Sequence, residues 1–241
     1  MIGLELVYAL DFDGVVCDSI HECFVNSYRA FLLTYKLQSL PVSPDKFWKE
    51  KFYSYRGVVR PSKNFYALWK LIVEDQIVPH NVKEFEQASH GLGNTLEEFD
   101  LNLTKVRNRQ IRESLADFIN LNGIFDQVIE VWNSLPRPLF IVTAKDENLV
   151  RIILDFHRLS VDGIFGRGSG EKYISLQKLA MDSCIEITKV KFVDDNPRFV
   201  EETKGVGIDA ALALWGYGPY ESREGKTLSN FREVLDFFNN V

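Results

Sequence analysis

Six side chains able to do acid–base or ligand chemistry stand at or just beyond the ends of short apolar runs. They are Asp11, Asp13, Thr143, Lys145, Asp194 and Asp195. Clustered carboxylates repel one another unless a cation lies among them, and hard oxygen ligands select Mg²⁺. A carboxylate can also attack phosphorus, while a second carboxyl group exchanges a proton with the leaving alkoxide or with water. With a hydroxyl and an ammonium to bind the phosphate oxygens, the combination fits phosphoryl transfer.

Short apolar runs along the chain predict the strands that would position these side chains. The runs are Leu4–Leu10, Leu139–Val142, Gly163–Gly166, Val190–Val193 and Ala210–Leu214. Between them, Glu147–His157 and Tyr173–Cys184 carry apolar residues at helical spacing on one face. Strands that alternate with such helices predict an α/β, Rossmann-like core, a parallel sheet with helices on both faces. Ligands of such sheets bind beyond the carboxyl ends of the strands, where the six side chains would lie.

Residues 18–125 show a different pattern, without a run that predicts a buried strand. The helical periodicities here are Cys23–Tyr35, Asn64–Glu74 and Val106–Leu121. Roughly one hundred residues are too many for an ordinary crossover between two strands. We therefore expect an all-helical insertion, a cap over 18–125, inserted after the first strand of a core formed by 1–17 and 126–241. The pattern Leu228–Phe238 predicts a final helix on that core.

Composition narrows the class of protein. Lys and Arg number 28 against 34 Asp and Glu, for a formal net charge of −6, so the chain lacks the basic footprint of a nucleic-acid binder. The three cysteines have no metal-binding spacing, which is typical of packed thiols in a reducing compartment. No apolar run approaches the length of a membrane span. We expect a cytoplasmic protein with no nucleic-acid or membrane partner.

Four motifs, in order along the chain, resemble those of the haloacid dehalogenase-like (HAD) hydrolase superfamily. They are Asp11-Phe12-Asp13-Gly14-Val15-Val16, Phe140-Ile141-Val142-Thr143, a lysine, and Lys191-Phe192-Val193-Asp194-Asp195. The sequence is most similar to phosphoglycolate phosphatase-like members with a helical cap after the first motif, which also have a segment similar to Leu214–Gly218. The resemblance implies a Mg²⁺-dependent phosphatase that hydrolyses a small phosphorylated metabolite, a phosphate monoester, through an aspartyl-phosphate.

The resemblance also implies a role for each residue that matches a motif. Asp11 would be the nucleophile and a metal ligand, and Asp13 the general acid and base that binds metal through its backbone carbonyl. Asp194, with Asp195, would supply the acidic metal ligands. The implied phosphate-binding residues are Thr143, Ala144 and a lysine, for which we choose Lys172.

The lysine and the fourth motif depart from the common pattern of the family. Lys172 is followed by Tyr173 where many relatives have proline, and Lys178 is the competing candidate. Arg198 stands where many relatives have a second acid, four residues after Asp194, so the adjacent acidic pair must supply the metal site.

The basic stretch Tyr55–Lys63 contains Arg56 and Arg60, which would bind an anionic group of the substrate if this loop faces it. The alternative is an exposed connection between helices. Two other functions remain open at this point. A sugar-phosphate mutase of the β-phosphoglucomutase kind would use Asp11 and Asp13 in the same roles, and a non-catalytic protein on this fold would only bind a phosphate ligand. The sequence leaves the substrate and the oligomeric state open.

Overall fold

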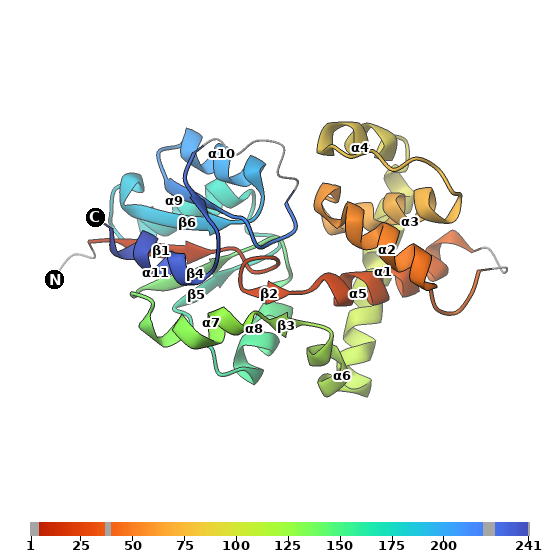
Figure 1. Ribbon diagram of the computed structural model, residues 1–241, viewed down its shortest axis with the longest axis horizontal. Helices are drawn as coiled ribbons and strands as arrows, with labels where there is room; N and C mark the ends of the chain where they lie inside the picture. Colours follow the sequence, from red (N-terminus) through yellow and green to blue (C-terminus); the bar gives the residue numbers. More distant parts are fainter. Residues whose placement is uncertain (1–4, 37–39, 219–224, 241) are drawn as a thin grey trace. The chain divides into compact units, whose positions relative to one another are not determined.

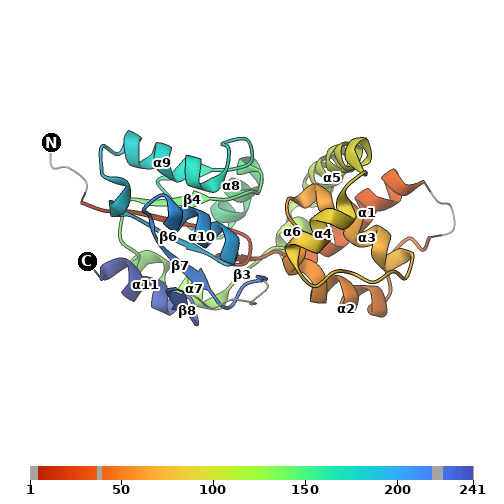
Figure 2. The same cartoon turned by 90° about the horizontal axis from the view of Figure 1, so that it is seen from above.

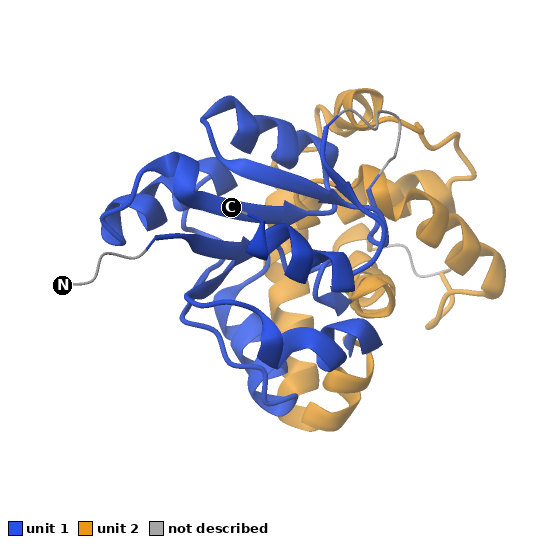
Figure 3. Ribbon diagram, turned by 60° about the vertical axis from the view of Figure 1, so that its left-hand side comes forward, with its two compact units in different colours: residues 1–18, 123–241 blue, residues 19–122 orange. Residues whose placement is uncertain are grey.

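The chain folds into two compact units, coloured separately in Figure 3. The structure is a computed structural model that describes residues 5–36, 40–218 and 225–240. Unit 1 comprises Met1–Asp18 and Gly123–Val241, and unit 2 comprises Ser19–Asn122. A short antiparallel pair, β2 (Cys17–Asp18) with β3 (Gly123–Ile124), joins the two chain segments of unit 1 where the insertion begins and ends. The pair places Asp18 and 123–125 in unit 1, whereas the sequence pattern suggested that they belong to the insertion.

Unit 1 is built on a six-stranded sheet of order β5-β4-β1-β6-β7-β8. Figure 1 labels its strands β5, β4, β1 and β6, and Figure 2 labels β7 and β8. All of the pairings in this sheet are parallel. The strands are β1 (Val7–Leu10), β4 (Leu139–Val142), β5 (Gly163–Phe165), β6 (Val190–Asp194), β7 (Asp209–Ala213) and β8 (Thr227–Leu228). The predicted α/β, Rossmann-like class is confirmed. Leu4, at the start of the first predicted strand, lies outside the described residues.

Helices cover both faces of this sheet, as Figure 2 shows. Val7 and Ala9 of β1 pack in one apolar cluster with residues of α9 and α10. Tyr8 points to the opposite face, since successive side chains of a strand alternate, and its ring contacts Phe238 of α11 at 4.8 Å between centroids. The helices of unit 1 are α7 (Asp126–Val131), η3 (Trp132–Ser134), α8 (Glu147–Phe156), α9 (Lys172–Asp182), η4 (Ile187–Lys189), α10 (Pro197–Gly205) and α11 (Arg232–Asn239).

The last helix is shorter than the sequence predicted. Leu228 belongs to β8, and α11 begins only at Arg232. Its C-terminal end is capped from the sheet, because the buried Lys191 of β6 donates to the carbonyls of Phe237, at 2.9 Å, and Asn240. An ammonium at a helix C-terminus satisfies carbonyls that have no partner inside the helix.

Among its described residues, the regular secondary structure of unit 2 consists of helices alone. Its helices are α1 (Ile20–Tyr35), α2 (Lys46–Tyr55), η1 (Arg56–Val58), η2 (Ser62–Asn64), α3 (Phe65–Val73), α4 (Val82–Ser89), α5 (Gly93–Glu113) and α6 (Leu115–Asn120). Its core is aromatic: the Trp69 ring lies 5.0 Å from Phe52 and 5.5 Å from Phe24 between centroids, and its indole donates to Ser27 Oγ at 2.7 Å. No helix among the residues the structure describes is long and apolar enough to cross a bilayer.

The expected helix Val106–Leu121 proves to be the end of one helix and the whole of another. The long α5 begins at Gly93 and ends at Glu113. Ser114 then adopts an extended conformation, φ −159°, and its hydroxyl accepts the N–H of Asp117 to cap α6. A serine that caps a new helix ends the preceding one, so the apolar periodicity continues across a break in the backbone.

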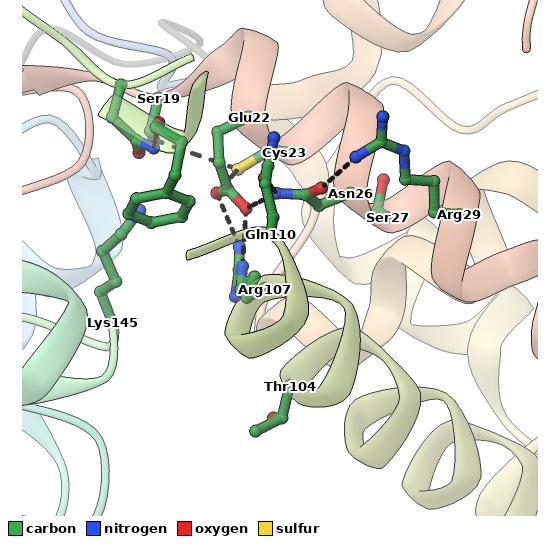
Figure 4. Close-up of polar contacts among 12 residues, drawn as sticks. Ser19, Glu22, Cys23, Asn26, Ser27, Arg29, Thr104, Arg107, Gln110 and Lys145 are labelled. Carbon is green, nitrogen blue, oxygen red and sulfur yellow. Dashed lines mark hydrogen bonds and ion pairs between the residues drawn. The ribbon is translucent and has the colours of Figure 1, made fainter. Parts of the chain in front are cut away.

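A buried polar network joins the two ends of unit 2, and Figure 4 shows it in close-up. Near the start of α1, Glu22 accepts two hydrogen bonds from Arg107 of α5, at 2.7 and 2.8 Å. Asn26, one turn later on α1, donates to Glu22 and to Gln110 of α5 at 2.9 and 2.8 Å. This network fastens α1 to α5, and the backbone N–H of Glu22 also donates to the Leu121 carbonyl at 3.1 Å, so the two ends of unit 2 are held together.

Candidate active site

Three adjacent central strands bring the proposed chemical groups to one edge of the sheet. Asp11 continues β1, and its N–H donates to Val193 of β6 at 2.8 Å. Thr143 follows β4 and donates its N–H to Phe165 at 2.9 Å, while Asp194 is the last residue of β6. Because these strands are parallel, their carboxyl ends meet at the same edge, and all three side chains are buried there.

Lys172, the first residue of α9, lies between two of the carboxylates. Its Nζ is 2.9 Å from Asp11 Oδ1, an ion pair without good hydrogen-bond geometry, and donates to Asp194 Oδ2 at 2.6 Å. The competing candidate, Lys178, lies on an exposed face of the same helix. Of the two lysines, the structure thus places Lys172 beside the acidic residues.

Burial and charge act in opposite directions on this ion pair. Burial raises the pKa of Asp11 to about 6, against the attraction of the Lys172 ammonium, and the negative charge of Asp194 adds to the rise. Burial alone would lower the pKa of Lys172, but the charges of Asp11 and Asp194 outweigh it and raise that pKa. The ammonium therefore stays protonated in the resting site.

A second buried lysine pairs with Asp13. Lys145 Nζ donates to Asp13 Oδ1 at 2.9 Å, and the backbone N–H of Lys145 donates to Thr143 Oγ1 at 3.3 Å. The intervening Ala144 lies in an exposed turn. The sequence predicts Lys145 at this edge of the sheet, from its position two residues after Thr143, as an ammonium for phosphate oxygens; its pairing with Asp13 has no local signal.

Asp195 is held by a segment distant in sequence. Its Oδ2 accepts the backbone N–H of Tyr217 at 2.6 Å, and the Tyr217 phenol donates to Asp18 Oδ1 at 2.7 Å. Burial, and then the negative charge of Asp18, raises the pKa of Tyr217 well above its ordinary value, so the phenol remains a donor. The sequence shows only that the segment containing Tyr217 resembles one in similar phosphatases, and no local pattern predicts its contact with Asp195.

The acidic cluster has the composition that a divalent cation requires. One carboxylate oxygen from each of Asp11, Asp194 and Asp195 lies within 4.8 Å of the other two, and all three residues are buried. These three carboxylates outnumber the ammonium group of Lys172, which contacts two of them, by two charges. Hard oxygen donors with an excess of two negative charges fit Mg²⁺.

Arg56 and Arg60 belong to unit 2, whereas the residues described above belong to unit 1. Arg56 begins η1, and its guanidinium lies 5.0 Å from the centroid of the Phe65 ring. Both arginines are half-buried. Each unit thus carries part of the predicted set of site residues.

Comparisons with known proteins identify the fold. No protein-family model matches the sequence, and no curated protein matches it. Among solved structures, the chain resembles a haloacid dehalogenase-like hydrolase from Streptococcus pneumoniae, with a TM-score of 0.61 at 19% identity over 97% of this chain and 98% of that one. It resembles a predicted phosphoglycolate phosphatase from Haemophilus somnus, with a TM-score of 0.65 at 14% identity over 98% and 99%.

A third solved structure with this fold has a different name. The Protein Tyrosine Kinase A of Mycobacterium tuberculosis matches with a TM-score of 0.60 at 18% identity, over 98% of this chain and 100% of that one. The fold therefore does not by itself fix the activity. The chain has the fold of these solved structures, and haloacid dehalogenase-like hydrolases, the family that its sequence motifs resemble, are among them.

Proposed function

We propose that the chain is a Mg²⁺-dependent phosphatase that hydrolyses a small phosphate monoester through a phosphorylated Asp11. The observation that supports this most is the position of Asp11, buried at the end of β1 beside Lys172 and Asp194. Haloacid dehalogenase-like neighbours whose names describe phosphatases support the same class of reaction.

In the first step Asp11 forms a bond to phosphorus while the bond from phosphorus to the ester oxygen breaks. Asp13, which enters this step as the carboxylic acid, gives its proton to the departing alkoxide, and the Thr143 hydroxyl and the Lys172 ammonium hold the non-bridging oxygens. In the second step a water attacks phosphorus, gives its proton to Asp13, and releases phosphate from Asp11. Asp11 and Asp13 are then restored to their starting states.

Asp11, Asp194, Asp195 and the backbone carbonyl of Asp13 would hold the Mg²⁺, which neutralises negative charge on the carboxylates and on the phosphate. Lys172 pairs with both Asp11 and Asp194, so it places a positive charge beside these carboxylates whether or not a metal ion is bound. We assign unit 2 the role of a cap that recognises the rest of the substrate, with Arg56 and Arg60 as the candidates for an anionic group.

The test is release of phosphate from a panel of small phosphate esters, with Mg²⁺ or with EDTA. We expect turnover that requires Mg²⁺ and that is lost in Asp11→Asn. The matched control is Asp155→Asn, which makes the same chemical change at an exposed position of α8 in the same unit, and it should retain the parent rate. Absence of release from every ester by a folded protein supplied with Mg²⁺ would refute the proposal.

A further inference from the structure

The segment Leu214–Gly218 is fastened to the loop that follows Asp13. The indole N–H of Trp215 donates to the Val15 carbonyl at 3.1 Å, and the Tyr217 phenol donates to Asp18 at 2.7 Å. Between these two anchors the Tyr217 backbone N–H donates to Asp195 Oδ2. A weaker contact of 3.4 Å joins the Tyr217 phenol to the Cys17 carbonyl, so the segment connects the first acidic motif and the residues after it with the last motif.

Glycines allow this segment to approach Asp195 closely. A Cβ on Gly216 would lie 2.6 Å from Asp195 Oδ2 and 2.6 Å from the Gly14 carbonyl oxygen, and would overlap Asp195 Cβ. A Cβ on Gly14, which has φ +86°, would lie 2.8 Å from Asp195 Cγ. Such distances are shorter than real Cβ contacts, so the Asp195 carboxylate is enclosed on two sides by backbone that only glycine can supply.

We propose that Leu214–Gly218 is the positioning element of the metal site, which sets the orientation of the Asp195 carboxylate toward Asp11 and Asp194. The Tyr217 N–H fixes one oxygen of Asp195, and the backbone at Gly14 and Gly216 limits how far the carboxylate can turn. Hydrogen-bonded partners of a metal ligand determine its orientation and so its affinity for the ion. The inference rests on the proposed function, because it concerns the same Mg²⁺ site.

The first experiment compares Gly216→Ala with Gly205→Ala by calorimetric titration with Mg²⁺ in the absence of substrate. Gly205 ends α10 in the same unit, and a Cβ there meets no atom within 4 Å. We expect Gly216→Ala to lower the Mg²⁺ affinity about tenfold or more, the usual effect of disturbing the partner of a ligand, and Gly205→Ala to match the parent. The half-saturating Mg²⁺ concentration for phosphate release should rise by the same factor.

A second matched pair of variants tests the same inference if the methyl group added in Gly216→Ala prevents folding. Trp215→Phe and Trp132→Phe each remove one indole hydrogen bond of 3.1 Å, to Val15 and to Ser160 respectively, but only the first lies on the positioning element. Trp215→Phe should weaken Mg²⁺ binding about threefold, whereas Trp132→Phe should leave it unchanged.

Mg²⁺ affinities equal to that of the parent in folded Gly216→Ala and in Trp215→Phe would overturn the inference, and so would equal losses in both tryptophan variants. A parent protein that binds no Mg²⁺ would instead refute the proposed function itself, and the inference with it. Titration of the parent protein alone therefore distinguishes a failure of this inference from a failure of the proposed function.

Discussion

Replacement of Asp11 by asparagine should make the metal-free protein more stable near neutral pH. The carboxylate is buried at a position where its pKa is raised from 3.8 to about 6. Asparagine has nearly the same shape and no charge, so it removes the cost of an ionised group in the core. The loss of activity expected for the same substitution would therefore accompany a gain in stability.

The size and sign of the effect follow from this pKa. Between pH 3.8 and about 6 the folded state retains a proton that the unfolded state has lost, so stability falls as the pH rises. Each pKa unit corresponds to about 1.4 kcal/mol, so a difference of roughly 2 units lowers the free energy of unfolding by about 3 kcal/mol. The full loss of stability is reached above about pH 6. Below the unfolded pKa this loss is absent, because Asp11 is protonated in both states.

The assay is urea unfolding in EDTA at about pH 4 and about pH 7.5, the two sides of the predicted transition. Amide exchange of peptides from β1 and β4 would follow unit 1 separately from unit 2. Asp11→Asn should exceed the parent by up to about 3 kcal/mol at the higher pH and by little at the lower one. The exposed control Asp155→Asn should stay within about 0.5 kcal/mol of the parent at both.

Two results would refute the reasoning. One is an Asp11→Asn variant no more stable than the parent at the higher pH in EDTA. The other is a gain of the same size at both pH values, since a gain independent of pH cannot come from ionisation of Asp11. Addition of Mg²⁺ should narrow the difference, because the ion binds the folded parent and stabilises it.

Three further outcomes are expected. Lys172→Met should lower kcat for phosphate release about 100-fold, because two buried carboxylates and the phosphate lose their ammonium partner, whereas Lys178→Met should leave the rate unchanged. Arg107→Met should destabilise unit 2 by about 3–5 kcal/mol in urea unfolding, since it leaves the Glu22 carboxylate buried without its guanidinium, and Arg107→Met combined with Glu22→Gln should recover part of the loss. Mg²⁺ at about 100 times its Kd should raise stability by about 2.7 kcal/mol, and melting curves with and without EDTA would show an equal stability if the ion does not bind.

Local sequence patterns were sufficient to predict most of the strands of the sheet. The runs that predicted β1, β4, β5, β6 and β7 are apolar and bounded by polar or turn-forming residues. The four of them that lie inside the sheet carry the signal of burial on both faces, whereas the edge strand β5 is half-buried. The two-residue strand β8 has no such signal in its sequence, because its position depends on pairing with β7 rather than on its own composition. The start of α5 was missed because Gly93, Asn94 and Thr95 are poor helix formers, and the tertiary contacts of the helix outweigh their preferences.

The candidate site was predictable where motifs and strand ends coincide. Asp11, Thr143 and Asp194 each stand at the end of a central strand, and parallel pairing brings such ends together. The contact of Tyr217 with Asp18 joins residues 199 positions apart, and no local pattern indicates such a pairing. The partnership of Lys145 with Asp13 depends on the side-chain directions of two loops, which a strand prediction does not supply.

The insertion after β1 also bears on how the chain reaches this structure. β1 lies in the middle of the sheet, yet its partners β4 and β6 come only at Leu139–Val142 and Val190–Asp194. Unit 2 is a continuous stretch between β1 and β4, and its two ends are joined by the hydrogen bond from the Glu22 N–H to the Leu121 carbonyl. The ion pair of Glu22 with Arg107 holds α1 against α5 beside that contact. If unit 2 folds first, the long flexible chain between β1 and β4 becomes a short connection between two points that are already close together. The entropy cost of closing that loop then no longer opposes the pairing of β1 with β4. The helical insertion would then act as a scaffold for sheet assembly, and weakening its buried ion pair would slow the folding of unit 1.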